Sequence, residues 1–291
     1  MIKCPQCSAR YDLAEKYCVK CGFIPVRLGG FIAWAPELAI KNNDFPEAGF
    51  EKLAQLESNS FWFRSRNAII LWALKKYFPD FESLMEVGCG TGFVLSSIAR
   101  LFPDRRVMGS EIYSAGLIHA ANRLPNIDLI QMDARRLPYE SEFDVLAAFD
   151  VIEHILEDEL VLSNFHRAIK PGGGVLVTVP QHPWLWSPID EAAFHKRRYS
   201  KKELHAKIEA AGFRILHSTS FVSFLLPLML VSRLFSKSKR QHSGNVELTL
   251  HPILDLVLEA LMKLEYALIS RGISLPAGGS RLVVCQKTLQ K

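Results

Sequence analysis

A glycine-rich turn between a short apolar run and an apolar helical pattern constrains this chain most. Glycines stand at Gly88, Gly90 and Gly92, and Glu86 lies two residues before the first of them. The residues before the turn predict a strand, and residues 93–101 repeat apolar side chains at helical spacing. Glycine lets the backbone turn tightly and approach a ligand that a Cβ atom would exclude. The pattern therefore predicts the first strand–turn–helix unit of a nucleotide-binding α/β domain.

Strands and helices alternate after this turn. The sequence predicts strands over residues 106–111, 127–133, 143–149, 175–179, 213–221 and 281–287, helices over 114–123, 157–169 and 201–211, and a turn over 171–174. Such alternation favours an α/β fold, with a parallel sheet covered by helices on both faces. Sheets of this kind bind their ligands at the carboxyl ends of the strands.

Acidic residues close three successive predicted strands at that edge. A carboxylate at Glu111 can accept both ribose hydroxyls of an adenosine. Asp133 can accept the adenine amino group, with Met132 and Ala134 beside the ring, and Asp150 is expected to face the reacting centre. One such acid alone would be a solvated strand end. Three of them behind a glycine turn predict contacts with a cofactor.

Over about residues 60–220 the chain resembles class I S-adenosylmethionine (SAM) methyltransferases. The segments that carry the resemblance are Glu86-Val-Gly-Cys-Gly-Thr-Gly92, Glu111, Met132-Asp133-Ala134, Phe149-Asp150-Val-Ile-Glu-His154 and Lys170-Pro-Gly-Gly173. The run from Asp150 to His154 is similar to the small-molecule branch that includes the ubiquinone-pathway O-methyltransferases. The resemblance implies a Rossmann-like sheet of seven strands and SAM as the cofactor, held at Glu86 and the glycine turn, with Arg66 on its carboxylate. It also implies in-line attack of an acceptor O, N or C on the sulfonium methyl group.

Two segments at the same edge supply candidates for the acceptor chemistry. His154 follows the fourth predicted strand and could be a general base, because the unperturbed histidine pKa is about 6.5. The loop over residues 180–200 combines two tryptophans with Asp190 and His195, a mixture typical of a pocket mouth. We predict His195 as the first choice of base, with His154 and Asp190 as further catalytic candidates.

Other roles for these residues stay open. His154 could be a packed residue at a helix start, and His195 could pin its loop to the following helix. In some relatives, acids and a histidine at this segment bind a divalent ion, which Asp150, Glu153 and His154 could do here.

The first 21 residues contain two CxxC pairs, Cys4 with Cys7 and Cys18 with Cys21. Each pair can present two thiolates to one ion, and two pairs complete a tetrahedral zinc site. The spacing predicts a structural zinc ribbon over residues 1–28, with a redox pair or free thiols as alternatives. A structural role follows because about 25 residues cannot build a core without a staple. Whether the ribbon also binds a partner stays open.

The remaining chain divides into four expected parts. Residues 29–60 are expected to be a linker and a helix, residues 61–220 the SAM-binding core, and residues 280–291 its last strand. Residues 221–279 are expected to form a helical insertion, either as a lid or as a membrane-surface segment. The segment 221–240 begins with an apolar run too short to span a bilayer and ends in basic residues, a pattern that is compatible with a peripheral membrane contact as well as with a lid.

The net charge of +5 is too small to indicate nucleic acid as the partner. We therefore expect a SAM-dependent methyltransferase, cytoplasmic or peripheral at the inner face of the membrane. Its expected acceptor is a small-molecule, lipid-linked or saccharide compound, methylated on oxygen. Two alternatives stay open: an RNA methyltransferase that grips RNA with the zinc ribbon, and a non-enzymatic partner-binding protein that keeps the SAM fold.

Overall fold

The computed structural model describes the chain except residues 13–14, 16, 40–46, 237–251 and 289–291. Its largest element is a sheet of nine strands. The strands are β3 (Val26–Leu28), β4 (Phe31–Ala33), β5 (Ser83–Val87), β6 (Arg106–Glu111), β7 (Asp128–Gln131), β8 (Phe143–Phe149), β9 (Ile169–Pro180), β10 (Phe213–Phe221) and β11 (Ser280–Lys287). Their order across the sheet is β10-β11-β9-β8-β5-β6-β7-β4-β3. From β9 to β4 in that order neighbours are parallel, whereas β11 is antiparallel to β9 and β10.

Helices connect these strands. They are α1 (Glu47–Leu56), α2 (Phe61–Tyr77), α3 (Phe93–Leu101), α4 (Ser114–Arg123), α5 (Asp158–Ala168), α6 (Pro188–Ala192), α7 (Lys201–Ala210), α8 (Leu226–Ser236) and α9 (Pro252–Ser270). Single 3-10 turns are η1 (Pro36–Leu38), η2 (Ala134–Arg136), η3 (Ile152–His154) and η4 (Pro183–Leu185). At the N-terminus β1 (Ile2–Lys3) and β2 (Arg10–Tyr11) form a small antiparallel pair of their own.

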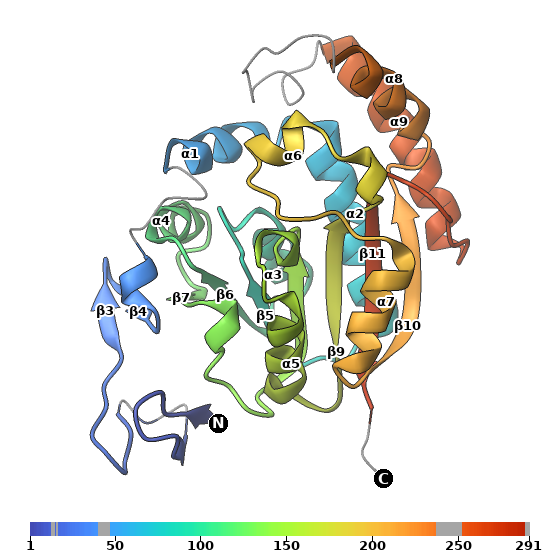
Figure 1. The fold of residues 1–291 in the computed structure, drawn as a ribbon. Coiled ribbons are helices and arrows are strands. Elements are labelled where there is room, and N and C mark those ends of the chain that lie inside the picture. The colour runs from blue at the N-terminus through green and yellow to red at the C-terminus, as the bar shows by residue number, and fades with distance from the viewer. Residues whose placement is uncertain (13–14, 16, 40–46, 237–251, 289–291) are drawn as a thin grey trace.

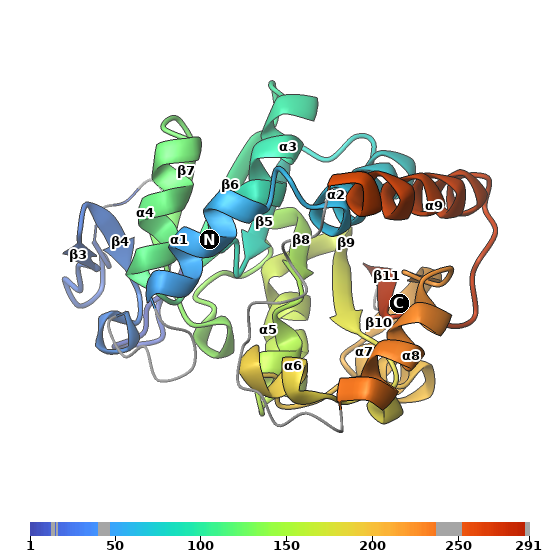
Figure 2. The ribbon, with the colours of Figure 1, turned by 90° about the horizontal axis from the view of Figure 1, so that it is seen from above.

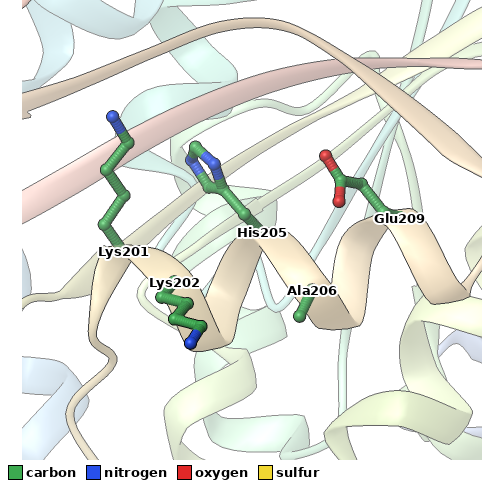
Figure 3. Close-up of a pocket in the computed structure, with 5 residues that line it drawn as sticks. All are labelled: Lys201, Lys202, His205, Ala206 and Glu209. Carbon is green, nitrogen blue, oxygen red and sulfur yellow. The ribbon is translucent and has the colours of Figure 1, made fainter.

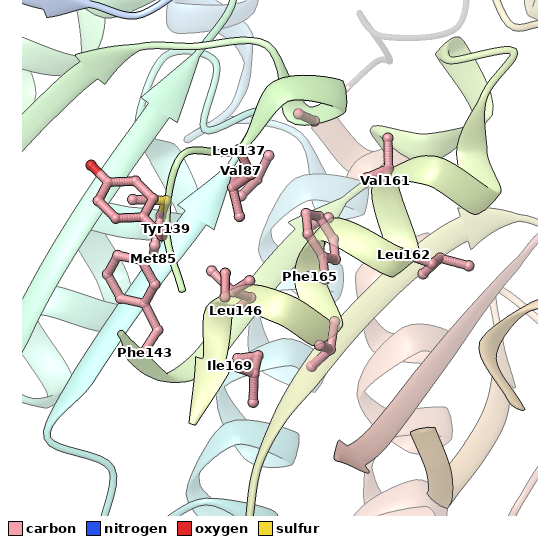
Figure 4. Packing of buried hydrophobic residues seen from close by; sticks show 14 of the residues in the cluster. Met85, Val87, Leu137, Tyr139, Phe143, Leu146, Val161, Leu162, Phe165 and Ile169 are labelled. Carbon is pink, nitrogen blue, oxygen red and sulfur yellow. The ribbon is translucent and has the colours of Figure 1, made fainter. Parts of the chain in front are cut away.

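The helices cover both faces of the sheet (Figures 1 and 2). Buried residues of α2, α3, α4 and α9 form one apolar cluster, and those of α5 and α7 form another. Side chains of β5 alternate between them, with Leu84 in the first cluster and Met85 and Val87 in the second. Figure 4 shows the second cluster, where Val161 and Phe165 of α5 pack over the sheet. Because both faces are covered, the carboxyl edge of the strands is the place for a ligand.

The structure confirms the α/β fold class, and the sheet is two strands wider than the seven expected. The extra strands come from the segment that was expected to be a ribbon end and a linker. Ile32 of β4 pairs in parallel with Ile130 of β7, and the Gln131 amide both donates to the Ala35 carbonyl (2.8 Å) and accepts from its N–H (3.0 Å). The short apolar segment of β4 thus pairs with the free edge of β7, and no local sequence pattern predicts this pairing.

The glycines expected to form a turn over residues 171–174 lie inside β9 instead. A Cβ atom at Gly173 would come within 2.4 Å of the Asp144 carbonyl oxygen, and one at Gly174 within 2.3 Å of the Cys285 carbonyl oxygen. These glycines therefore permit close approach of neighbouring backbones, which the sequence alone does not distinguish from a turn.

Two helices, α8 and α9, occupy the interval between β10 and β11, where a helical insertion was expected. No helix in the described part of the chain is long and apolar enough to cross a membrane. The basic residues at the end of the predicted membrane-surface segment, Lys237, Lys239 and Arg240, lie outside the described residues.

Candidate functional site

The glycine turn lies at the carboxyl end of β5, as predicted. Gly88, Gly90 and Gly92 have φ angles of 72°, 53° and 75°, a region that favours glycine. A Cβ atom at Gly88 would come within 2.5 Å of the Val151 side chain, whereas one at Gly90 would meet no atom within 4 Å. The loop is therefore packed from behind at Gly88 and borders open space at Gly90, which is the geometry of a cradle for a ligand.

Two carboxyl groups back this cradle. The Glu111 carboxylate, at the end of β6, accepts the N–H groups of Gly90 (3.0 Å), Ile112 (2.7 Å) and Tyr113 (3.1 Å). These bonds fix its orientation and leave acceptor capacity on Oε2. Glu86 is fully buried, burial raises its pKa to about 8, and its Oε2 has no hydrogen-bond partner among the described residues.

The residues predicted to surround an adenine ring follow β7. Met132, Asp133 and Ala134 are all buried. Asp133 also caps η2, because it accepts the Arg135 N–H at 2.9 Å, and it forms an ion pair with the Arg135 guanidinium at 3.0 Å. Sequence reasoning missed this local role, so a substitution at Asp133 would disturb the loop as well as any adenine contact.

Two further predicted cofactor contacts form an ion pair with each other. Arg66 of α2 donates to the Asp150 carboxylate at the end of β8. Asp150 has a φ of 56°, an uncommon backbone conformation for a residue with a side chain, and the Arg66 guanidinium lies 4.9 Å from the centre of the Trp62 ring. The structure thus brings Arg66 to the catalytic edge, and its predicted contact with a SAM carboxylate stays a prediction.

A further carboxylate, missed by the sequence analysis, connects the end of α1 to the glycine turn. The Thr91 hydroxyl donates to both oxygens of Glu57 (2.6 and 2.7 Å), and Arg123 of α4 pairs with the same carboxylate at 2.9 Å. The three residues come from separate elements, so no local motif could have predicted this contact.

The acceptor candidates also converge at this edge. Ligand atoms of Glu153, His154 and His195 all lie within 4.8 Å of one another, and the two histidine rings are 4.9 Å apart. Asp150, the third residue of the predicted divalent-ion set, is paired with Arg66. If a divalent ion binds here, the geometry favours Glu153, His154 and His195 as its ligands, with His195 in the place predicted for Asp150.

Asp190 lies behind His195. It is completely buried, the His195 Nδ1 lies 2.9 Å from its Oδ1, and the Arg198 Nε donates to the same oxygen at 2.6 Å. Burial alone would raise the pKa of Asp190, but the hydrogen bond from His195 and the charge of Arg198 lower it. Both oxygens of Asp190 are engaged, because the Ser187 N–H (2.9 Å) and hydroxyl (3.1 Å) donate to Oδ2, so we interpret Asp190 as a positioning residue. It favours the tautomer in which Nδ1 carries the proton and Nε2 can accept one.

Glu153, the acid of the cluster, is completely buried. It has no exposed surface, and neither carboxylate oxygen has a hydrogen-bond partner among the described residues. Burial, followed by the nearby charge of Asp150, raises the pKa of Glu153 well above its usual value. Burial therefore disfavours the charged form of the Glu153 carboxyl beside the two histidines.

The four N-terminal cysteines form the second candidate centre. Their sulfur atoms all lie within 4.8 Å of one another, with Cys4–Cys21 and Cys7–Cys18 separations of 3.6 Å. Four thiolates at the Zn–S distance of about 2.3 Å would lie roughly 3.8 Å apart, so the cluster fits a tetrahedral zinc ion. Matching backbone bonds shape the two knuckles, from Ser8 N–H to Cys4 O (2.9 Å) and from Gly22 N–H to Cys18 O (2.8 Å).

This cysteine cluster lies far from the glycine turn. The N-terminal segment docks on the loop that precedes β8: Lys3 N–H donates to the Pro138 carbonyl (2.6 Å), and Arg10 pairs with Glu140 (2.5 Å). The loop before a strand lies at the amino edge of the sheet, and Figure 1 shows the N-terminus at the end of the molecule opposite to α1 and α6. The cysteine cluster therefore cannot contribute groups to the carboxyl-edge site.

One surface hollow lies elsewhere and carries no such chemistry. All five residues that line it lie along the single helix α7 (Figure 3): Lys201, Lys202, His205, Ala206 and Glu209. The His205 Nε2 is 2.9 Å from the Ser218 hydroxyl, which gives this histidine a structural contact. We assign no ligand to the hollow.

Comparison with known sequences agrees with this geometry. Residues 84–173 match the family model described as a methyltransferase domain. A protein of Mycolicibacterium smegmatis named "Probable S-adenosylmethionine-dependent methyltransferase" is 30% identical over 175 residues, 58% of this chain and 66% of that protein. The "Ubiquinone biosynthesis O-methyltransferase" of Brucella anthropi is 26% identical over 152 residues, 46% of this chain and 60% of that protein. The aligned regions thus span 60 to 66% of the length of these relatives.

Comparison with solved structures supports the same fold. Phosphoethanolamine N-methyltransferase 2 of Haemonchus contortus, in complex with SAM, superposes with a TM-score of 0.57 at 18% identity, over 85% of this chain and 58% of that chain. At this identity the likeness establishes the fold alone. The domain match and the superposition together identify the region around the glycine turn as a methyltransferase domain.

Proposed function

We propose that this chain, which carries the class I methyltransferase fold, uses SAM to methylate an oxygen of a small-molecule or lipid-linked acceptor. The observation that carries the proposal is the position of the cradle at Gly90, backed by Glu111, on the same strand edge as the cluster of Glu153, His154 and His195. One half of the edge suits a nucleoside, and the other suits proton transfer.

The residues of the first half fit SAM. Glu111 has free acceptor capacity for ribose hydroxyls, and the open space beside Gly90 allows a ligand to contact the backbone. Oε2 of Glu86 has no hydrogen-bond partner among the described residues, and the amino group of the methionine moiety could donate to it. Arg66 offers a guanidinium for its carboxylate. SAM bound there would supply an electrophilic methyl group on its sulfonium sulfur.

The second half suits an acceptor that must lose a proton. His195 can accept that proton on Nε2, while Asp190 holds Nδ1 and stabilises the resulting imidazolium. Glu153 is buried and has no hydrogen-bond partner among the described residues, so its negatively charged form is disfavoured beside the base. A hydroxyl acceptor needs such a base more than an amine does, which favours O-methylation.

A divalent ion at Glu153, His154 and His195 is the alternative use of the same cluster. It would orient an acceptor oxygen and lower the pKa of that oxygen, without a histidine base. Chelation separates the two. Activity that survives prolonged chelation requires the base, and activity that is restored only by a divalent ion requires the metal.

We also propose that the four-cysteine cluster holds one structural zinc ion. Its sulfur separations and its paired backbone bonds support this assignment. Its position at the amino edge favours a role in stabilising the N-terminal segment over a role in substrate binding.

A pair of glycine variants tests the cofactor site. Gly90→Ala places a methyl group in open space beside the turn, and Gly172→Ala does the same at a distant site, with φ angles of 53° and 82°. Both changes strain the backbone by about 1 kcal/mol. Calorimetric titration with SAM should show at least tenfold weaker binding for Gly90→Ala and unchanged binding for Gly172→Ala. A wild-type protein that does not bind SAM would overturn the proposal.

A further inference from the structure

Helix α9 is apolar on two opposite sides. Its inner side places Leu258, Met262 and Ile269 in the buried cluster beside α2. Its outer side leaves large apolar side chains uncovered, with Leu256 66% exposed and Leu264 56% exposed. The other exposed apolar residues of this helix are Ile253, Leu254, Val257 and Leu261. A helix that is apolar all round is normally covered on every side, so its outer side calls for an occupant.

Helix α8 lies at the same end of the molecule as α9 (Figure 1), but it is set apart from α9, on the side of α7 (Figure 2). Leu228, Leu230 and Val231 are 52%, 38% and 49% exposed, and Phe224 just before the helix is 37% exposed. The two helices are tied together by the buried carboxylate of Glu265, which accepts the N–H groups of Ser223 (2.7 Å) and Phe224 (2.9 Å). We call the exposed apolar residues of α8 and α9, together with Phe224, the insertion face.

The acids that the structure describes on α8 and α9 are paired or buried. The α9 acids Asp255 and Glu259 are held by Arg64 of α2 at 2.7 and 2.5 Å, and Glu265 is buried. The sequence of α8 contains no acid. Lys263, 72% exposed, pairs with Glu259 at 3.0 Å. The sequence that joins the two helices contributes three further basic residues, Lys237, Lys239 and Arg240, and one acid, Glu247.

We propose that the insertion face docks on the surface of an anionic lipid bilayer, from which the enzyme draws its acceptor. Exposed apolar side chains, described acids that are all paired or buried, and a joining sequence with more basic than acidic residues are suited to the headgroup region of such a bilayer. This inference rests on the proposed methyl transfer and adds the acceptor class, a lipid-borne hydroxyl compound.

The insertion face connects directly to the acceptor half of the site. Met229 of α8 packs against Gly279, where a Cβ atom would come within 2.8 Å of the Met229 sulfur. The Gly279 carbonyl accepts from Arg198 at 3.4 Å, and Arg198 pairs with Asp190, the partner of His195. A bilayer against α8 would therefore lie close to the residues that receive the acceptor.

Vesicle flotation tests this proposal with the full-length protein. Wild type should float at low salt with vesicles of phosphatidylcholine and phosphatidylglycerol, and at least about tenfold less with phosphatidylcholine alone. The double variant Leu256→Glu, Leu264→Glu should lower the floating fraction at least about tenfold. It removes two leucines that would be buried in the bilayer and adds two negative charges. The matched control is Ile118→Glu on α4, also an exposed apolar residue (51%), which should float like wild type.

Two readouts keep the outcomes separate. Calorimetry with SAM, without lipid, reports the cofactor site and the fold of each variant, so failure of methyl transfer is distinguished from failure of docking. Light scattering reports self-association. A wild type that stays unbound to anionic vesicles would overturn the proposal. So would a double variant that floats normally, or a wild-type dimer that dissociates in the double variant without any vesicle binding.

Discussion

The cofactor half and the acceptor half of the site share one strand edge but are built differently. The cofactor half, from Glu86 to Glu111, is a continuous strand–turn–helix–strand unit. The acceptor half joins η3, the loop around α6 and the backbone of Gly279, which are far apart in the sequence. In the first half the buried Glu86 keeps an unpaired oxygen, whereas in the second His195, Arg198 and Ser187 all engage Asp190, although Glu153 nearby is unpaired. The local sequence is therefore enough to form the first half, whereas the second half depends on hydrogen bonds and ion pairs between segments that are distant in the sequence.

The largest expected effect is in the acceptor half. His195→Ala should lower kcat by about 10²- to 10⁴-fold, because it removes the proposed general base. Its affinity for SAM should stay within about twofold of wild type. Rate measurements with labelled SAM and calorimetry on the same preparation check both values. His205→Ala, which changes a histidine on the outer helix α7, serves as the control and should keep full activity.

The reverse pattern is expected in the cofactor half. Glu111→Ala should weaken SAM binding about 100-fold, since hydrogen bonds to a charged group contribute about 1.5–3 kcal/mol each. Glu209→Ala on α7 is the control and should bind SAM normally. If Glu111→Ala bound SAM as tightly as wild type, the two halves would have been assigned incorrectly.

Glu86 provides a smaller effect that depends on pH. Burial raises the pKa of Glu86 to about 8, above the usual glutamate value of 4.5, so between these pH values the folded state retains a proton that the unfolded state has lost. The stability of the SAM-free wild type should therefore fall as the pH rises from about 5 to 8. Glu86→Gln cannot ionise, so its free energy of unfolding should fall by a few kcal/mol less than that of wild type over this pH range. Urea unfolding at pH 5, 7 and 9 measures it, and parallel pH profiles for the two proteins would contradict the burial argument.

The smallest expected effect at the site comes from the amino edge. Wild type should contain one zinc ion per chain, and Cys21→Ser should lower the zinc content and the melting temperature. Affinity for SAM should change by less than about twofold, because the cysteine cluster docks on the loop before β8, away from Gly90. A large loss of SAM binding would mean that the ribbon supports the cofactor half from a distance.

The difference between the two halves also explains what the sequence could predict. The strand, the glycines and Glu111 follow one another at fixed spacings, so the cofactor half was predictable in its elements and in its acids. The ion pair of Arg66 with Asp150 and the contacts of Glu57 with Thr91 join elements distant in sequence, and no local pattern encodes them. The sequence nominated both Asp190 and His195, but only burial shows that Asp190 acts through His195.

The same limit applies to the edge of the sheet. Residues 26–33 lack a strong strand pattern, and they become strands because β7 offers unpaired backbone groups beside them. The apolar sequences of α8 and α9 predicted helices, but only the fold shows which side of α9 packs against α2 and which apolar residues of both helices remain exposed.

The most direct test of the account follows a labelled methyl group from SAM. Wild type, His195→Ala and Glu111→Ala would each be incubated with methyl-tritiated SAM and an extract of the host, and the label divided among lipid, aqueous small molecules and nuclease-sensitive polymer. The account predicts label in the lipid fraction for wild type. It also predicts at least about 100-fold less label for His195→Ala, although that variant binds SAM normally. Label released by ribonuclease, or equal transfer by wild type and His195→Ala, would contradict the account.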